Sequence, residues 1–330
     1  MPDGPGERTQ RGGLVAPPQR GGLVIVDKPA GLTSHDVVAR VRRLAGTRRV
    51  GHAGTLDPMA TGVLLVGIGR ATRLLGHLAL HEKDYAATIR LGRTTSTDDA
   101  QGQVLSTASA ELVTDEAVIS AVASFVGEIE QRPPAVSAIK VDGKRAYKRV
   151  RAGEDVVLAT RKVTVSRFEV GEVRRPARGE VRRPARDEVR RPAESPDVDL
   201  QWLDFDALVT CSSGTYIRSL ARDVGDLLGV GGHLAALRRT RVGAFDLTTA
   251  RTLAELEADF TVTSLDEVAA TAFVRRDLTA DEALSLSHGG KLTTSDLGDE
   301  PVAAFGPDGE VVALLEDRDG VARALVVFVG

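Results

Sequence analysis

Stretches with strand periodicity and stretches with helix periodicity follow one another irregularly along the chain, and this mixture limits the folds open to it. From Tyr85 to Leu91, alternate residues form an apolar set, the pattern of a half-buried strand. From Ser34, which can cap a helix, apolar residues recur at helical spacing to about Ala45, and Gly46 then ends the helix. The same reasoning predicts strands at Gly22–Asp27, Val63–Val66 and Phe205–Cys211 and a helix at Thr215–Leu228. The elements lack the regular strand–helix–strand order of a parallel sheet, so the pattern predicts the α+β class.

Composition divides the chain into four parts. Residues 1–20 are rich in Gly, Pro, Arg and Gln without an apolar stretch, so we expect a disordered tail and not a signal peptide or anchor. Residues 171–194 contain three near-copies of one octapeptide, and Pro with alternating charge cannot build a core. We therefore expect a low-complexity insertion there, in a loop between two strands of a main domain at 21–268. Residues 269–330 should form a small β-rich domain, with strands at 302–305, 311–315 and 324–329.

The overall composition indicates a soluble protein with a substantial core. Apolar residues make up 42% of the 330 positions, and no stretch reaches the roughly 18 apolar residues of a membrane span. The single cysteine, Cys211, excludes an internal disulfide and a cysteine-based metal cluster, and it falls in a predicted core strand. We expect a reduced, cytoplasmic protein without membrane contact.

Basic residues gather in two short stretches, although the net charge is only −3. Residues 271–330 are acidic, so the rest of the chain is net positive. Such clusters suit contacts with nucleic-acid phosphates, but solvated helix faces would give the same pattern. The second stretch should form a strand, 136–141, and a basic helix, 144–151. The clusters are Arg40, Arg42, Arg43, Arg48 and Arg49, and Lys140, Lys144, Arg145, Lys148, Arg149 and Arg151.

Two polar segments could carry chemistry. Gly51–Gly62 contains one carboxylate, Asp57, and one imidazole, His52, among glycines that let a backbone approach a ligand closely. Asp57 could be a nucleophile, a general base, a metal ligand or merely a turn cap. A second metal ligand at useful spacing is missing there. In the other segment, Cys211–Arg218, Arg218 lies in the first turn of a predicted helix. Its guanidinium could keep a carboxylate ionised or simply face solvent.

Five blocks of the sequence resemble, in order and spacing, the motifs of the TruB family, the bacterial tRNA pseudouridine-55 synthases. The similarity extends from about Gly22 to Phe245 and is interrupted by the octapeptides. The blocks are Gly22–Gly31 (GLVIVDKPAG), Gly51–Gly62 (GHAGTLDPMATG), Lys83–Tyr85 (KDY), Pro133–Tyr147 (PPAVSAIKVDGKRAY) and Ser213–Arg218 (SGTYIR). The resemblance implies a mixed, mostly antiparallel central sheet flanked by helices, the pseudouridine synthase fold, followed by a small PUA-like RNA-binding domain.

The resemblance also implies an activity, a substrate and a set of residues. The activity is conversion of uridine 55 in the tRNA T-loop to pseudouridine, without cofactor or metal, by a monomer that needs no protein partner. Asp57 would be the nucleophile, and Arg218 would pair with it. Carried over position by position, the other roles are stacking on the uracil (Tyr85), contact with the target nucleotide (Tyr216), the loop that holds the flipped nucleotide (His52), packing near the base (Leu237) and support of that loop (Lys28).

The chemistry agrees with this assignment. Conversion of uridine to its C-glycoside adds and removes nothing overall, and a carboxylate can attack either C1′ of the ribose or C6 of the ring. The sequence leaves these two points of attack open. A non-catalytic RNA-binding protein or tRNA-folding chaperone is the alternative, which the intact Asp57, Tyr85 and Arg218 disfavour. A hydrolase with an aspartate nucleophile would need a second acid, which these motifs lack.

Overall fold

The computed structural model describes residues 20–135, 140–141, 144–145, 158–176, 201–295 and 297–329, with only the backbone at 140–141 and 144–145. The chain divides into two compact units, Met1–His81 with Arg241–Gly330, and Glu82–Thr240. The predictions for residues 1–19, for residues 136–139 of the predicted strand, for the second and third octapeptides and for residues 146–151 lie outside the described residues.

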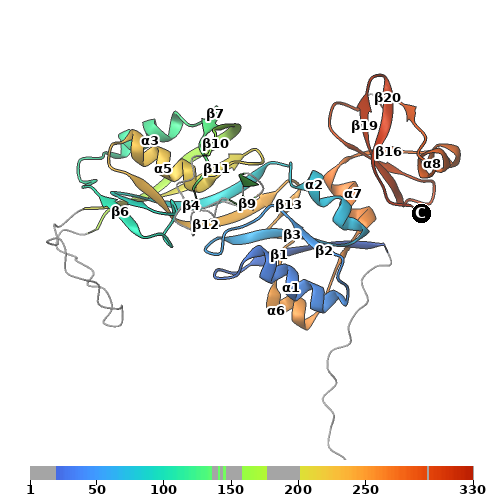
Figure 1. The fold of residues 1–330 in the computed structure, drawn as a ribbon, viewed down its shortest axis with the longest axis horizontal. Helices are drawn as coiled ribbons and strands as arrows, with labels where there is room; N and C mark the ends of the chain where they lie inside the picture. The colour runs from blue at the N-terminus through green and yellow to red at the C-terminus, as the bar shows by residue number, and fades with distance from the viewer. Residues whose placement is uncertain are drawn as a thin grey trace, which may run out of the picture. The chain divides into compact units, whose positions relative to one another are not determined.

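The first unit is built around strand β1 (Gly21–Lys28), which is almost wholly buried. β1 pairs antiparallel with β3 (Thr61–Gly69) and β15 (Thr263–Ser264) and parallel with β14 (Arg251–Thr252). β2 (Val50–Ala53) adds to β3, and β13 (Phe245–Asp246) forms a hairpin with the end of β12 (Gly232–Val242). The helical segments of this part are α1 (Ser34–Ala45), η1 (Arg70–Arg73), α2 (Leu75–Leu78), α6 (Leu253–Ala258) and α7 (Leu265–Ala272) (Figure 1).

Helix α1 shows why the local sequence folds as predicted, with one correction. Val37, Val38 and Val41 form its buried face, and Gly46 ends it with a left-handed φ of 62°. Its N-cap is Thr33 and not Ser34: the Thr33 side chain accepts from the Asp36 backbone N–H, and the Asp36 carboxylate accepts from the Thr33 backbone. Ser34 is left buried and available for another contact.

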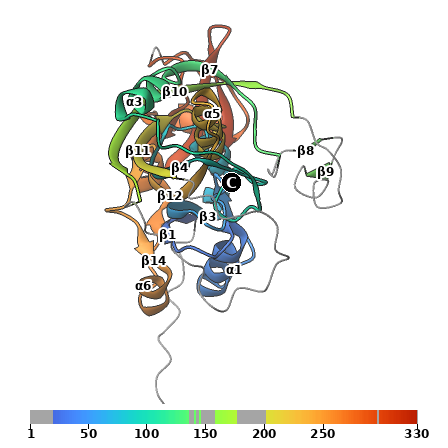
Figure 2. The ribbon, with the colours of Figure 1, turned by 90° about the vertical axis from the view of Figure 1, so that its left-hand side faces the viewer.

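The second unit is a sheet with two helices on it. Its strands lie in the order β12, β4 (Lys83–Leu91), β11 (Leu203–Cys211), β10 (Arg161–Arg174) and β7 (Gly127–Gln131). β4, β11, β10 and β7 pair antiparallel. Helices α3 (Asp115–Ala123) and α5 (Ile217–Leu227) lie side by side against these strands (Figure 1; Figure 2). A separate hairpin joins β5 (Arg93–Thr95) to β6 (Val104–Thr107).

Three expectations for this unit need correction. The helix predicted from Thr215 begins at Ile217, with Tyr216 as its N-cap. Lys144–Arg145 forms strand β9, paired with β8 (Lys140–Val141), and does not begin a helix. The first octapeptide does not lie wholly in a loop, because Gly171–Arg174 completes β10.

The start of the octapeptide segment is held by its arginines. Arg174 pairs with Asp206 at 2.6 Å, and Arg175 donates to Asp115 at 2.6 Å and to the Val113 carbonyl at 3.0 Å. Pairing with β11 continues as far as Arg174 opposite Asp204. Charge and proline suggested an insertion without structure, but the neighbouring strand supplies partners that make the first four residues an extension of the sheet.

Residues near the C-terminus form the predicted β-rich part, a five-stranded sheet in the order β16-β18-β19-β20-β17 with helix α8 (Ala280–Ser287). The strands are β16 (Val274–Asp277), β17 (Leu292–Thr293), β18 (Val302–Phe305), β19 (Val311–Arg318) and β20 (Val321–Val327). Arg20, predicted to belong to a disordered tail, instead pairs at 2.9 Å with Asp266 of α7 and with Glu310. In the part of the chain that the structure describes, no helix is long and apolar enough to cross a membrane.

Candidate active site

Asp57 lies in the loop that connects β2 to β3. The loop is bounded by glycines with left-handed backbones, Gly54 at φ 75° and Gly62 at φ 99°. Asp57 itself is half-buried, and its carbonyl accepts from the backbone N–H of Ala60 at 3.1 Å, which closes a tight turn. The sequence therefore places this carboxylate on a short, sharply turned loop between two paired strands.

Two buried side chains hold this loop: Lys28, at the end of β1, and Ser34, the first residue of α1. Ser34 donates to the Leu56 carbonyl at 3.1 Å and accepts from the Leu56 backbone N–H at 2.9 Å. The Lys28 ammonium, fully buried, donates to the carbonyls of Leu32 at 2.7 Å, Pro29 at 3.0 Å and Pro58 at 3.4 Å. The residues on both sides of Asp57 are thus bonded to the end of β1 and the start of α1.

His52 lies on β2 opposite Val66 of β3. Its ring meets the His35 ring edge-on, with 5.4 Å between the centroids. His35 belongs to the first turn of α1, so the imidazole predicted to lie in the RNA-facing loop lies on a strand, half-buried, and contacts a helix of the same unit.

Tyr85, Leu237 and their neighbours belong to the sheet of the second unit. Tyr85 is buried on β4 opposite Val209 of β11. Lys83, two residues earlier on the same buried face, is opposite Cys211. Burial first, and the nearby Arg239 second, lower the pKa of Lys83 to about 8. Leu237, like Arg239, is buried on β12.

Cys211 does not have the properties of a nucleophile. It is buried in β11, and burial raises the pKa of its thiol to about 11. A thiol that stays protonated at neutral pH is a poor nucleophile and behaves as a small core residue, as the sequence indicated.

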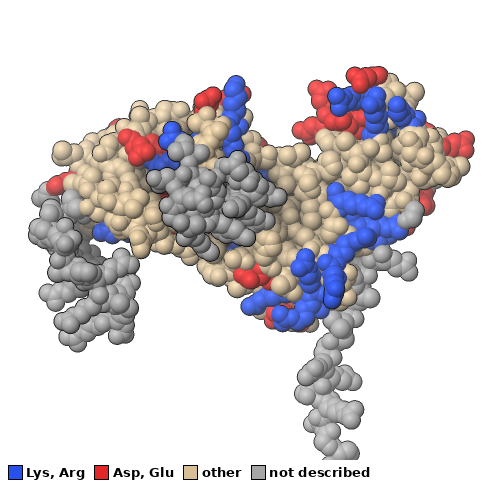
Figure 3. All heavy atoms as spheres, viewed as in Figure 1, with Lys and Arg blue, Asp and Glu red and all other residues tan. Residues whose placement is uncertain are grey.

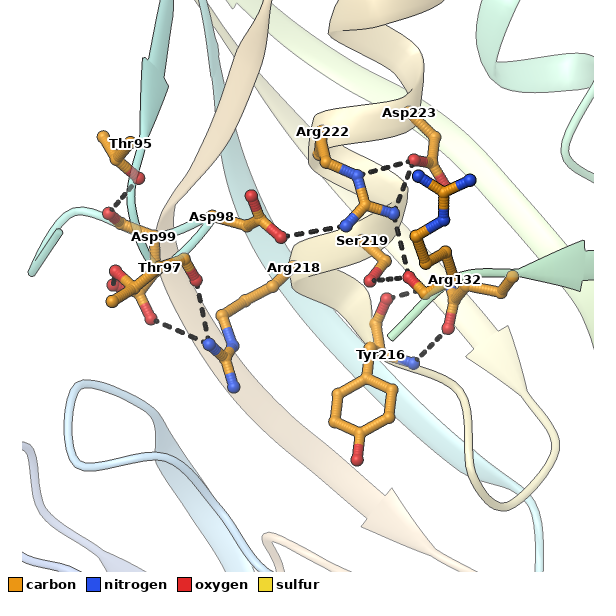
Figure 4. A network of polar contacts seen from close by, with 11 residues as sticks. Thr95, Thr97, Asp98, Asp99, Arg132, Tyr216, Arg218, Ser219, Arg222 and Asp223 are labelled. Atoms are coloured by element: carbon orange, nitrogen blue, oxygen red, sulfur yellow. Dashed lines mark hydrogen bonds and ion pairs between the residues drawn. The ribbon is translucent and has the colours of Figure 1, made fainter. Parts of the chain in front are cut away.

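The start of α5 carries Tyr216 and Arg218, which project to the same side (Figure 4). The Arg218 guanidinium is buried, donates to the Thr97 carbonyl at 2.8 Å and lies 3.6 Å from the Asp99 carboxylate. The guanidinium of Arg161 lies over the Tyr216 ring, with 4.7 Å between the Arg161 Cζ atom and the ring centroid. The backbone of Tyr216 is held by Gln131, whose amide bonds both its N–H and its carbonyl.

A second layer of charge lies behind Arg218. Arg222, one turn further along α5, pairs with Asp98 at 3.0 Å and with Asp223 at 2.8 Å, and it donates to the Arg132 carbonyl at 2.8 Å (Figure 4). Burial raises the pKa of the Asp98 carboxyl, although the two arginines oppose that shift. The polar segment 94–99 was the only sequence signal for this layer, and such segments also occur in ordinary loops.

The predicted site residues fall in both units. The first contains Lys28, His52 and Asp57, and the second contains Tyr85, Tyr216, Arg218 and Leu237. Sequence reasoning missed Gln131, Asp99 and Arg161 as contacts of these residues, and Ser34 as a contact of Leu56 beside Asp57. Among the described residues, no group of three or more His, Cys, Asp or Glu side chains is arranged to hold a metal ion.

Comparison with known proteins places this chain among the pseudouridine synthases. Residues 42–217 match the model of the TruB family pseudouridylate synthase N-terminal domain. Residues 218–282 match the tRNA pseudouridylate synthase B C-terminal domain, and residues 273–329 match the C-terminal domain of tRNA pseudouridine synthase II. The chain belongs to the TruB family, as its motifs predicted.

Curated relatives and a solved structure agree with this assignment. tRNA pseudouridine synthase B of Thermobifida fusca (strain YX) is 57% identical over 306 residues, which cover 93% of this chain and 98% of that protein. The protein of the same name from Arthrobacter sp. (strain FB24) is 52% identical over 312 residues, covering 92% and 95%. A crystal structure of a Cbf5-Nop10-Gar1 complex matches with a TM-score of 0.66 at 25% identity, covering 93% of this chain and 85% of that one. The predicted α+β pseudouridine synthase fold is confirmed.

Proposed function

We propose that this protein converts uridine 55 in the T-loop of tRNA to pseudouridine, with Asp57 as the nucleophile. The observation that carries the proposal is the 57% identity, over nearly the whole of both chains, to a relative named tRNA pseudouridine synthase B. The position of the uridine and the role of Asp57 come from the motif resemblance. The loop geometry supports that role, since Lys28 and Ser34 hold the backbone on both sides of the carboxylate.

The target uridine is stacked in the RNA, so the enzyme has to turn it outward before attack. Stacking on an aromatic ring returns about 1–3 kcal/mol per base, which offsets much of the unstacking cost. Tyr85 is the residue proposed to stack on the uracil, with Tyr216 in contact with the same nucleotide. Tyr85 is buried on a strand that is paired on both sides, which limits the movement of its ring and suits a stacking platform.

Asp57 then attacks either C1′ of the ribose or C6 of the uracil. The N1–C1′ bond breaks, the uracil turns within the site, and the C5–C1′ bond forms. The bond to Asp57 breaks again, C5 loses its proton and N1 takes one up, so the product is an isomer of the substrate. The nucleophile must be ionised, and a water-poor site disfavours its charge. Arg218 is proposed to offset that penalty, because a guanidinium stays protonated at any physiological pH.

Substitution of Asp57 by Asn tests the nucleophile. An amide of the same shape cannot form the covalent link, so Asp57→Asn should bind a T-arm stem-loop normally and yield no product. Tritium release from C5-labelled uridine measures turnover, and filter binding measures affinity. Turnover within tenfold of wild type would contradict the assignment. A wild-type protein that binds the stem-loop but releases no tritium would instead indicate a non-catalytic RNA-binding protein or chaperone.

The substrate proposal makes a separate prediction about size and salt. Arg42, Arg43, Arg48 and Arg49 are exposed at the end of α1 and in the turn after it, where basic side chains gather on one face (Figure 3). A short T-arm stem-loop should be modified nearly as well as whole tRNA, and each phosphate contact should contribute a slope of about −0.7 to −0.9 to the salt dependence of binding. Binding that is independent of salt would contradict these contacts.

A further inference from the structure

The end of β7 is tied to the start of α5 by four hydrogen bonds. Gln131, fully buried, accepts from the Tyr216 backbone N–H at 2.7 Å and donates to the Tyr216 carbonyl at 3.0 Å. The next carbonyl, of Arg132, accepts from the Ser219 hydroxyl at 2.9 Å and from Arg222 at 2.8 Å (Figure 4). A side-chain amide that bonds both polar groups of one residue leaves that residue little rotational freedom.

Arg161 acts on the side chain of the same residue. It faces Gln131 directly across the β7–β10 pairing, and its guanidinium lies over the Tyr216 ring with 4.7 Å between Cζ and the centroid. A planar guanidinium at this distance stabilises the ring electrostatically and covers one of its two faces. The backbone and the ring of Tyr216 are therefore both held from two adjacent strands.

Tyr216 has no side-chain cap of its own to fix it at the start of α5. Its backbone is extended, with φ −106° and ψ 113°, and it makes no capping hydrogen bond with its side chain. Residues 212–216 are half-buried or exposed, so local packing constrains the turn weakly. The hydrogen bonds of the turn itself hold Ser212 and Thr215, and Gln131 and Arg161 hold Tyr216.

We propose that Gln131 and Arg161 are positioning residues for uridine modification, which set the place of Tyr216 against the target nucleotide. The inference rests on the proposed function, in which Tyr216 contacts that nucleotide. One ring face of Tyr216 is occupied by Arg161, so the nucleotide can meet only the other face or the hydroxyl edge. Neither positioning residue takes part in bond making.

The kinetic test separates positioning from binding. In Arg161→Lys the charge remains but the planar stack is lost, and Gln131→Leu keeps the volume without the amide. Both should lower the single-turnover rate at saturating enzyme by about tenfold to a hundredfold, the effect of misplacing a substrate contact by less than 1 Å. The dissociation constant of the stem-loop should change less than threefold. Arg167→Lys on the same strand and Gln103→Leu in an exposed turn are matched controls that should match wild type.

A pH profile provides a signature that a merely structural role would not move. In Gln131→Glu, the protonated carboxyl can donate and accept as the amide does, but the ionised form can only accept and faces the Tyr216 carbonyl. Burial raises the pKa of such a carboxyl, while the guanidinium of Arg161, opposite Gln131 in the strand pairing, lowers it. The rate of Gln131→Glu relative to wild type should therefore rise about tenfold as the pH falls from 8 to 5.5, while that of Gln131→Leu stays level. A ratio for Gln131→Glu that is level and equal to one would overturn the role of the amide.

Fluorine NMR tests, without an activity assay, whether Gln131 and Arg161 hold Tyr216. The chain has three tyrosines, so 3-fluorotyrosine gives three resonances, and Tyr216→Phe assigns the one of interest. Arg161→Lys, and Gln131→Glu at pH 8, should shift or broaden the Tyr216 signal and leave the Tyr85 signal in place. An unmoved Tyr216 signal in both variants would overturn the proposal even if Asp57→Asn is inactive as expected.

The same measurements distinguish positioning from another role for Arg161, contact with an RNA phosphate. If it gripped an RNA phosphate, Arg161→Leu would weaken stem-loop binding and reduce the salt slope by nearly one contact, with the saturated rate unchanged. That result would overturn the positioning role of Arg161. A lowered saturated rate with an unchanged salt slope would support it.

Discussion

Lys28 offers the sharpest test of how the loop of Asp57 is held. Its ammonium is completely buried and bonds three carbonyls, those of Leu32, Pro29 and Pro58. Pro58 directly follows Asp57, and its carbonyl also accepts from the Gly31 backbone N–H at 2.8 Å. Lys28→Met keeps most of the side-chain volume and removes the donor together with its charge, so its effects report on how this ammonium is held.

The magnitude follows from which carbonyls lose a partner. The Pro58 carbonyl keeps its bond from Gly31, whereas the carbonyls of Leu32 and Pro29 lose the ammonium. Pro29 is exposed and Leu32 half-buried, so water can replace part of what each carbonyl loses, and removal of a buried charge returns a further part of the cost of about 1–3 kcal/mol per unpaired buried group. We expect a net loss of about 1–2 kcal/mol in the free energy of unfolding. A shift of Asp57 by less than 1 Å should also lower the modification rate by about a hundredfold.

Urea unfolding and single-turnover tritium release measure the two effects. Lys162→Met is the matched control, because the Lys162 side chain is 70% exposed and pairs with the exposed Glu128. The control should stay within about 0.5 kcal/mol of wild type. Lys28→Met with control-like stability and an unchanged rate would refute the idea that this ammonium holds the loop.

Three further predictions follow from burial, from the octapeptides and from the proposed ion pair. Burial lowers the pKa of Lys83 to about 8, so the folded state binds fewer protons than the unfolded state between pH 8 and about 10.4. Lys83→Met should therefore raise the free energy of unfolding at pH 7 by up to about 3 kcal/mol, and the gain should shrink toward pH 10; urea titrations at both pH values that give equal gains would contradict this. Deletion of residues 179–194 should leave the melting temperature within a few degrees of wild type. Deletion of residues 171–194 should lower the melting temperature by about 3–6 °C, because it removes the end of β10 and the pair between Arg174 and Asp206. Equal melting temperatures for the two deletions would show that this strand end does not contribute to stability. Arg218→Ala should lower the rate and move the acid limb of the pH–rate profile to higher pH, because the active carboxylate is deprotonated, and Arg218→Lys should recover only part; weakened RNA binding with an unmoved acid limb would defeat the ion-pair role.

Much of the fold was legible in local patterns. The alternation from Tyr85 to Leu91 is repeated in the burial of β4, and the end of α1 at Gly46 follows from the left-handed backbone there. The motif blocks predicted the family, which the comparisons confirm. Local patterns were wrong at Ser34, which is not the N-cap of α1, and at Lys144–Arg145, which forms a strand and not the start of a helix. In both cases a contact with a neighbouring loop or strand decided the outcome.

The sequence by itself determined the fold class, the family and the residue types available for chemistry, because these depend on periodicity and on short motifs. Only the tertiary structure showed what holds the candidate site. Ser34 meets Leu56 across 22 residues, Gln131 meets Tyr216 across 85, and Arg218 meets Thr97 across 121. Contacts of that separation leave no periodic trace, and the same serine or glutamine on a surface would look identical in the sequence. Their roles arise from burial, which turns an ordinary polar group into one that must be bonded in one arrangement.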